Sequence, residues 1–251
     1  MTLGPGERLS VLSQDHFAFD EFTVINTVLM GHTVLWDIMQ EKDALYAKPD
    51  FSEEDGNHAA ELEAEFAELN GWEAESDVSK LLQGLGLSED LLYQTMGDLS
   101  GNEKVKILLA QALFGNPDII LMDEPTNGLD IPGKSQFRKL LIREMNESRG
   151  IVISTHQVQD VEQLLDHVVI LDNAHVLLDA SVTEISHKLY FTQTDNESET
   201  SEAYYALPSY NGHSVMLPNP EDKDSEINLE LLFNGTLAHP ETICPLFNAE
   251  K

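Results

Sequence analysis

Two adjacent carboxylates, Asp123 and Glu124, end the apolar run at residues 119–122. Pro125 follows at once and turns the chain, so both side chains are expected at the edge of a sheet. A carboxylate in that position can hold a magnesium ion bound to nucleotide phosphates, and the next one can polarise an attacking water. Taken alone, the pair is better explained as a surface turn after a core strand.

Other polar residues also lie at the start of a predicted helix or at the end of a predicted strand. Ser100 and Gly101 open a helix, where main-chain donors, a hydroxyl and a small residue together make an anion site. His156 follows the apolar run 150–154 and can contact a terminal phosphate or orient a water. Gln14 ends a short alternating run, where its amide can reach the metal or the water. Each also has an ordinary explanation, as a helix cap, a hydrogen-bonded histidine or a polar strand end.

The elements that would position these residues alternate between strands and helices, which predicts an α/β core. The run at 119–122 is wholly apolar, as expected of a central parallel strand. Further strands are predicted at 8–14, 150–154, 167–171 and 176–178. Helices are predicted at 23–46, 58–69, 72–85, 88–94, 102–114, 135–148, 158–165, 181–189 and 227–237. Ser181 and Glu184 have the spacing of a capping box.

From residue 192 the character of the sequence changes. Residues 192–202 are polar and acidic and read as a linker or loop. Asn211 and Gly212 stand between apolar segments and predict a hairpin turn. Residues 219–226 form a second acidic loop before the helix at 227–237. We therefore expect a small α+β extension over residues 190–251, after a main domain over 1–189.

The charge balance narrows the possible partners. The 251 residues include 14 basic and 45 acidic side chains, for a net charge of −31. Such a surface repels nucleic-acid phosphates and anionic lipid, and it disfavours direct nucleic-acid binding. The single cysteine, Cys244, excludes an intramolecular disulfide and a cysteine-rich metal site. No stretch has the apolar length of a membrane span or signal core, so a cytoplasmic protein is expected.

In their order along the chain, these residues resemble the motifs of an ABC-type ATPase domain. Gln14 falls at the Q-loop position, and residues 99–103 (LSGNE) resemble the signature motif at the head of a helix over 99–114. Residues 119–125 (IILMDEP) resemble the Walker B strand with its catalytic glutamate. Residues 126–130 (TNGLD) resemble the D-loop, and residues 154–156 (STH) the switch-histidine loop.

The resemblance implies an α/β nucleotide-binding domain with a parallel core sheet and a helical subdomain. It implies ATP and Mg²⁺ bound between two such domains, so a second ABC domain, identical or different, is the expected partner. Asp123 and Gln14 would contact the metal, and Glu124 and His156 would be catalytic. The residues expected to bind nucleotide are Gln14, Leu99, Ser100, Gly101, Asn102 and Asp130.

Two departures from the family pattern stand out. Asn102 occupies the place of a second signature glycine, although asparagine tolerates left-handed geometry better than other side chains. The phosphate loop, called Walker A, belongs before Gln14, but the thirteen residues there contain no Gly-Lys-Ser. Residues 128–135 match G-x-x-x-x-G-K-S, but Pro132 would remove a donor and Asp130 would add negative charge. We therefore expect an incomplete domain that lacks its Walker A segment.

Different parts of the chain resemble two different subfamilies. Residues 8–130, with an acidic arm-like helical insertion at about 36–72, look like the ABC-F group, which acts in translation at the ribosome. From residue 131 the sequence looks like the ATPase subunit of an ABC exporter, which would dock a membrane-spanning subunit at the inner face of the membrane. The primary hypothesis is an ABC-F-like ATPase. The alternatives are a transporter motor subunit and a non-hydrolysing fragment that complements a partner domain.

Overall fold

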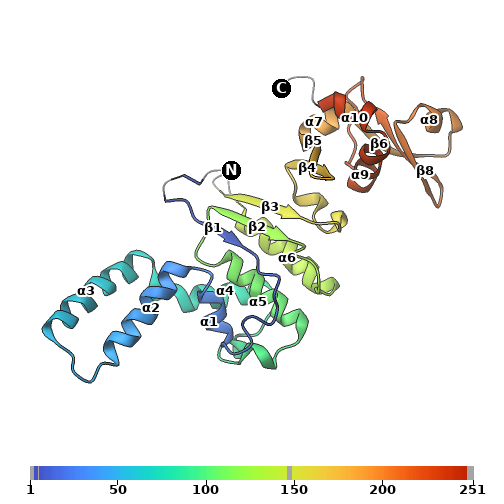
Figure 1. Cartoon of the computed structure of the whole chain (residues 1–251). Coiled ribbons are helices and arrows are strands. Elements are labelled where there is room, and N and C mark those ends of the chain that lie inside the picture. The colour runs from blue at the N-terminus through green and yellow to red at the C-terminus, as the bar shows by residue number, and fades with distance from the viewer. Residues whose placement is uncertain (1–2, 5, 146–148, 248–251) are drawn as a thin grey trace. The chain divides into compact units, whose positions relative to one another are not determined.

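The computed structural model describes residues 3–4, 6–145 and 149–247, which fold as two compact units, Met1–His156 and Gln157–Lys251. The first unit contains a parallel three-stranded sheet in the order β1 (Leu9–Val11), β2 (Ile119–Asp123), β3 (Gly150–Ser154). β2 lies in the middle, as predicted, with Leu121 opposite both Val11 and Val152. All three strands therefore end at the same edge, where the predicted chemistry is located (Figure 1).

The sheet is buried on one face among the described residues. Ile120 and Met122 are fully buried. On the opposite face Val11, Leu121 and Val152 remain 57%, 39% and 45% exposed. The wholly apolar sequence of β2 thus predicted its central place correctly but overestimated its burial, since parallel strands usually pack helices on both faces.

The helices of the first unit differ from the predictions mainly at their ends. The single helix predicted at 23–46 is wrong, because the chain turns at Gly31 between two helices. A Cβ atom on Gly31 would lie 2.0 Å from the main-chain oxygen of Gln111, so the close approach requires glycine. The helices are α1 (Val24–Leu29), α2 (Thr33–Tyr46), α3 (Glu53–Glu68), α4 (Ala74–Gly84), α5 (Gly101–Leu113) and α6 (Ile131–Glu144).

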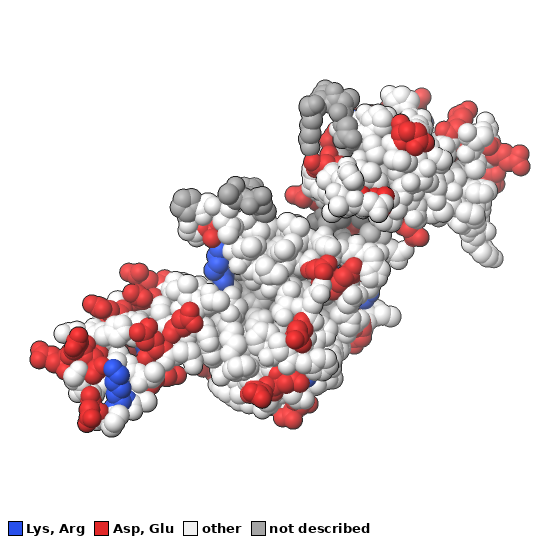
Figure 2. All heavy atoms as spheres, in the orientation of Figure 1, with Lys and Arg blue, Asp and Glu red and all other residues white. Residues whose placement is uncertain are grey.

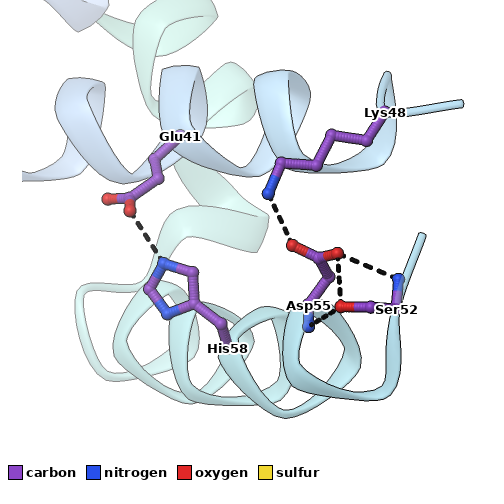
Figure 3. A network of polar contacts seen from close by, with 5 residues as sticks. All are labelled: Glu41, Lys48, Ser52, Asp55 and His58. Atoms are coloured by element: carbon purple, nitrogen blue, oxygen red, sulfur yellow. Dashed lines mark hydrogen bonds and ion pairs between the residues drawn. The ribbon is translucent and has the colours of Figure 1, made fainter. Parts of the chain in front are cut away.

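Helices α2 and α3 form a hairpin within the predicted insertion, and α3 begins earlier than predicted. Ser52 is the N-cap of α3 and forms a reciprocal capping box with Asp55. Lys48 at the end of α2 lies 2.5 Å from Asp55, and His58 lies 2.8 Å from Glu41 (Figure 3). Acidic side chains gather over these two helices (Figure 2).

Two short helices predicted from sequence are 3-10 turns instead. Residues 88–94 form the turn Glu89–Leu91, and residues 158–165 form Val158–Asp160 and Glu162–Leu164. Helix α6 begins at residue 131 rather than 135, because Asp130 caps it with Pro132 in its first turn. Residues 146–148 of the predicted helix lie outside the described residues.

The second unit is a small α+β body with its own apolar core, centred on Leu178, Leu189, Met216, Leu232 and Ile243. Its hairpin of β4 (His167–Asp172) and β5 (His175–Ser181) was predicted. A second antiparallel sheet has the order β6 (Leu189–Thr194), β8 (Gly212–Pro218), β7 (Tyr205–Ser209). The helices are α7 (Val182–Lys188), α8 (Glu197–Glu202), α9 (Leu229–Ala238) and α10 (Pro240–Phe247).

Two predictions for the second unit are corrected. The expected linker at 192–202 is wrong, because residues 192–194 complete β6 and residues 197–202 form α8. Ser181 does cap α7 through the Glu184 amide, but the Glu184 carboxylate lies 2.7 Å from Lys188 instead of closing a capping box. The hairpin at Asn211 and Gly212 is confirmed. None of the helices in the described ranges combines the length and hydropathy that a membrane crossing requires.

Candidate functional site

The parallel sheet places Gln14 and Asp123 side by side. The Leu12 amide donates to the Leu121 carbonyl at 2.9 Å, which extends the pairing of β1 with β2 toward their carboxyl ends. Two residues later, the Gln14 side-chain amide donates to the Asp123 carboxylate. Both side chains offer the hard oxygen atoms that Mg²⁺ prefers. Among the described residues no group of three or more His, Cys, Asp or Glu is placed to hold a metal ion.

Glu124 is fixed by the chain that follows β3. Its backbone has a positive φ of 47°, and its amide donates to the Ser154 carbonyl at 2.7 Å. One carboxylate oxygen, Oε2, accepts from the Thr155 hydroxyl at 2.9 Å. The other, Oε1, accepts from the His156 main-chain amide at 2.9 Å and lies 2.6 Å from His156 Nδ1. The turn thus aims Glu124 across the sheet edge toward the histidine loop.

The electrostatics of this cluster favour the ionised form of Glu124. Partial burial raises the pKa of the Glu124 carboxyl, but hydrogen bonds from the His156 side chain, the His156 amide and the Thr155 hydroxyl outweigh it, so the pKa lies below its usual value. An ionised carboxylate can accept a proton or a hydrogen bond from an attacking water. The Glu124 carboxylate is therefore ionised at neutral pH at the end of this strand.

Thr155 was not singled out from the sequence. It stands between two residues that were, Ser154 and His156, and its hydroxyl holds the carboxylate oxygen that the histidine does not contact. The only sequence signal was a hydroxyl residue next to the predicted switch histidine. That signal is weak, because hydroxyl residues are common after strands.

Ser100 and Gly101 lie at the N-terminus of α5, as predicted. Ser100 forms a capping box with Glu103: its hydroxyl donates to the Glu103 carboxylate at 2.7 Å, and its amide donates there at 2.9 Å. These bonds lower the pKa of Glu103. No atom lies within 4 Å of a Cβ built on Gly101, so the space beside it is open. Leu99, half-buried, precedes the cap and donates its amide to Met96.

Asn102 and Asp130 both lie near Gly133 at the start of α6. Asp130 accepts from the Gly133 amide at 2.8 Å, and a Cβ on Gly133 would lie 3.5 Å from the Asn102 side-chain oxygen. That oxygen is buried and lacks a hydrogen-bond partner among the described residues. The candidate residues therefore form two groups, and within the described ranges no hydrogen bond joins the α5 start to the cluster of Gln14, Asp123, Glu124 and His156.

The pattern at residues 128–135 does not form a phosphate cradle. Helix α6 already begins at residue 131, and the Gly133 and Lys134 amides donate to the side chain and carbonyl of Asp130. Donors that a phosphate loop would turn toward its ligand are thus used inside the helix. This agrees with rejecting the segment as Walker A.

Comparison with known proteins agrees with the fold. Residues 4–127 match the family model described as ABC transporter. An uncharacterized ABC transporter ATP-binding protein, YkpA, from Bacillus subtilis is 54% identical over 68% of this chain and 31% of its own length. A probable ATP-binding protein, YbiT, from Escherichia coli is 43% identical over 68% of this chain and 32% of its own length.

Two proteins of lower sequence identity are also ATP-binding proteins of transporters. EcfA2, an energy-coupling factor transporter ATP-binding protein from Staphylococcus aureus, is 33% identical over 47% of this chain and 41% of its own length. A solved ATP-binding subunit of an ABC transporter superposes with a TM-score of 0.51 at 20% identity, over 71% of this chain and 60% of that one.

The fold is thus the α/β fold of ABC ATPases, and residues 4–127 are similar to the ABC transporter family. It spans about a third of the length of YkpA and YbiT.

Proposed function

We propose that this chain binds and hydrolyses Mg²⁺-ATP as the ATP-binding part of an ABC transporter. The observation that carries the proposal is the hydrogen-bonded cluster at the sheet edge, in which Gln14 meets Asp123 and Glu124 meets His156. The proposed metal ligand and base stand on consecutive residues, so both can serve the same phosphate and attacking water.

Each residue has a role in this proposal. Asp123 and Gln14 hold Mg²⁺, Glu124 accepts hydrogen from the attacking water, and His156 contacts the terminal phosphate while it orients Glu124. ATP supplies the phosphoryl group, and Mg²⁺ neutralises the charge that develops on its oxygens.

In this proposal the residues at the start of α5, together with Asp130, face a partner domain. The signature residues Leu99, Ser100, Gly101 and Asn102, with Asp130, serve an ATP held mainly by a second ABC domain. The open space beside Gly101 and the first-turn amides of α5 support this orientation, since both favour close approach of phosphate. The pairing makes each ATP contact two chains, and a membrane-spanning subunit would receive the resulting motion.

The first experiment is calorimetric titration of the full chain with ATP, with and without Mg²⁺. We expect Mg²⁺-dependent binding that survives Lys134→Ala. Glu124→Gln should keep the binding and lose hydrolysis by about a hundredfold or more, since general-base catalysis contributes at that scale. Absence of binding would instead support a non-hydrolysing fragment that complements a partner. Loss of binding in Lys134→Ala alone would show that residues 128–135 are a phosphate loop after all.

An ABC-F role at the ribosome is the second candidate. It is favoured by one feature, the α2–α3 hairpin at the position of the predicted arm. Against it stands the acidic surface of that hairpin, because contact with ribosomal RNA needs basic residues. Co-sedimentation with ribosomes at low and high salt separates the two functions. Salt-sensitive co-sedimentation supports the ABC-F role, and its absence at low salt leaves the transporter role.

A further inference from the structure

A groove of about 970 Å³ lies in the second unit, and none of the residues of the proposed ATP site lines it. We call it the β6 groove. Its lining includes Phe191 and Gln193 of β6 and, from the segment before α9, Ser225 and Ile227. Leu165 adds apolar surface to the lining. Its volume is that of a ligand pocket.

Strand β6 offers an unpaired edge to this groove. In the described part of the chain β6 pairs with β8 alone. The Phe191 amide points away from β8, because it donates to the Ser225 hydroxyl at 3.1 Å. Main-chain donors alternate between the two edges of an antiparallel strand, so the Gln193 amide points outward as well. An edge of this kind readily pairs with another extended chain.

The segment beside the edge, residues 224–227, forms few hydrogen bonds, whereas both of its ends are anchored. At one end the Asn219 side chain accepts from the Lys223 amide at 2.8 Å. At the other end the Leu229 amide donates to Glu162 at 3.0 Å. Between these ends, the only hydrogen bond from residues 224–227 to β6 in the described structure is that of Ser225. A single side-chain hydrogen bond of this kind is worth little, so an incoming main chain can displace it.

The acidic residues that line the groove favour one kind of peptide. Glu162, Asp224 and Glu226 all line the groove. Over residues 157–251 the sequence contains 17 acidic and three basic residues. Complementary charge steers association and excludes acidic competitors. A basic extended segment therefore fits this groove better than an acidic one.

We propose that the β6 groove binds an extended basic peptide segment of a partner protein, which adds as a strand to the outer edge of β6. The peptide main chain takes the Phe191 amide from Ser225 and pairs with the Gln193 amide. Its basic side chains face Glu162, Asp224 and Glu226. This inference does not depend on ATP binding, because none of these residues belongs to the ATP site.

The test is fluorescence anisotropy of the full chain with a short labelled peptide in which lysine and valine alternate. The same peptide with glutamate in place of lysine is the charge control, and one with alternate amides N-methylated is the main-chain control. We expect binding of the lysine peptide alone, weakening at high salt. No binding of the lysine peptide, or equal binding of either control peptide, would overturn the proposal.

Matched variants locate the binding edge. Gln193→Pro removes one outward donor without touching the pairing with β8, whereas Gln193→Ala keeps that donor. We expect about tenfold weaker binding for Gln193→Pro, an unchanged affinity for Gln193→Ala, and equal or tighter binding for Ser225→Ala. Unchanged affinity in folded Gln193→Pro would exclude β6 as the docking edge. If circular dichroism shows Gln193→Pro unfolded, Asp224→Asn with Glu226→Gln replaces it, and an affinity insensitive to that change would overturn the proposal.

Discussion

The Nδ1 atom of His156 lies 2.6 Å from Oε1 of Glu124, and the His156 main-chain amide donates to the same oxygen. Two residues that the motif resemblance gives separate roles thus form one hydrogen-bonded pair. Thr155 holds the remaining carboxylate oxygen. The orientation of the proposed base is therefore set by three donors on two successive residues, so that displacement of this loop would move the base with it.

Removal of the Thr155 hydroxyl should slow ATP hydrolysis without weakening ATP binding. We expect Thr155→Val to lower kcat by about tenfold at unchanged KM, because one hydrogen bond to the base is lost. Thr155→Ser should retain most of the rate, since it keeps the hydroxyl. Steady-state kinetics of the three proteins measure this, with calorimetric ATP binding as the control. A fully active Thr155→Val would show that the contact is dispensable.

Substitution of Gly31 should destabilise the first unit. In Gly31→Ala the new methyl would lie 2.0 Å from the Gln111 carbonyl oxygen, so the turn between α1 and α2 must move away from α5. We expect a loss of about 2 kcal/mol or more in the free energy of unfolding, as for overpacked core positions. Urea denaturation measures it, with Gly101→Ala as the matched control. Similar values for the two variants would contradict the close approach at Gly31.

Gly101→Ala should weaken ATP-dependent dimerisation while it leaves the free energy of unfolding nearly unchanged. Nothing lies within 4 Å of the added methyl, and alanine favours a helix, so stability should change by less than about 1 kcal/mol. If phosphate approaches this surface from a second domain, the methyl should obstruct it and weaken ATP-dependent dimerisation. Analytical ultracentrifugation with Mg²⁺-ATP on a Glu124→Gln background checks the effect. Dimerisation as strong as in the parent would remove Gly101 from the proposed interface.

Helix α2 should lose its cap in acid. The His32 Nδ1 atom accepts from the Leu35 amide at 3.3 Å, which requires a neutral ring. Burial and the nearby Arg8 charge lower the pKa of His32 below 6.5. This stabilisation is therefore complete above pH 6.5 and is lost as the pH falls through the lowered, folded-state pKa.

Asparagine at position 32 provides the control, because it caps helices without titrating. Relative to His32→Asn, the native chain should lose about 1 kcal/mol of unfolding free energy on acidification, the scale of a helix cap. Denaturant unfolding at a series of pH values measures the difference. Parallel pH profiles for the two proteins would exclude a capping role for neutral His32.

Local patterns predicted most of the elements but not their junctions. The central place of β2 followed from its apolar run, and the hairpin at Gly212 followed from its turn residues. The break at Gly31 could not be found, because its cause is the approach of the Gln111 backbone from far along the chain. The last three residues of β6, 192–194, were assigned to a linker, because polar residues favour a strand there only when β8 supplies hydrogen bonds.

The sequence by itself predicted the candidate site residues and determined their order, because carboxylates after an apolar strand and small residues at a helix start carry their chemistry locally. It also determined the acidic surface. Only the tertiary structure decided which residues meet: parallel pairing brings Gln14 to Asp123, and the positive φ at Glu124 turns it to Thr155 and His156. It also exposed one face of the sheet and the edge of β6. Such relations depend on distant segments, which local sequence does not encode.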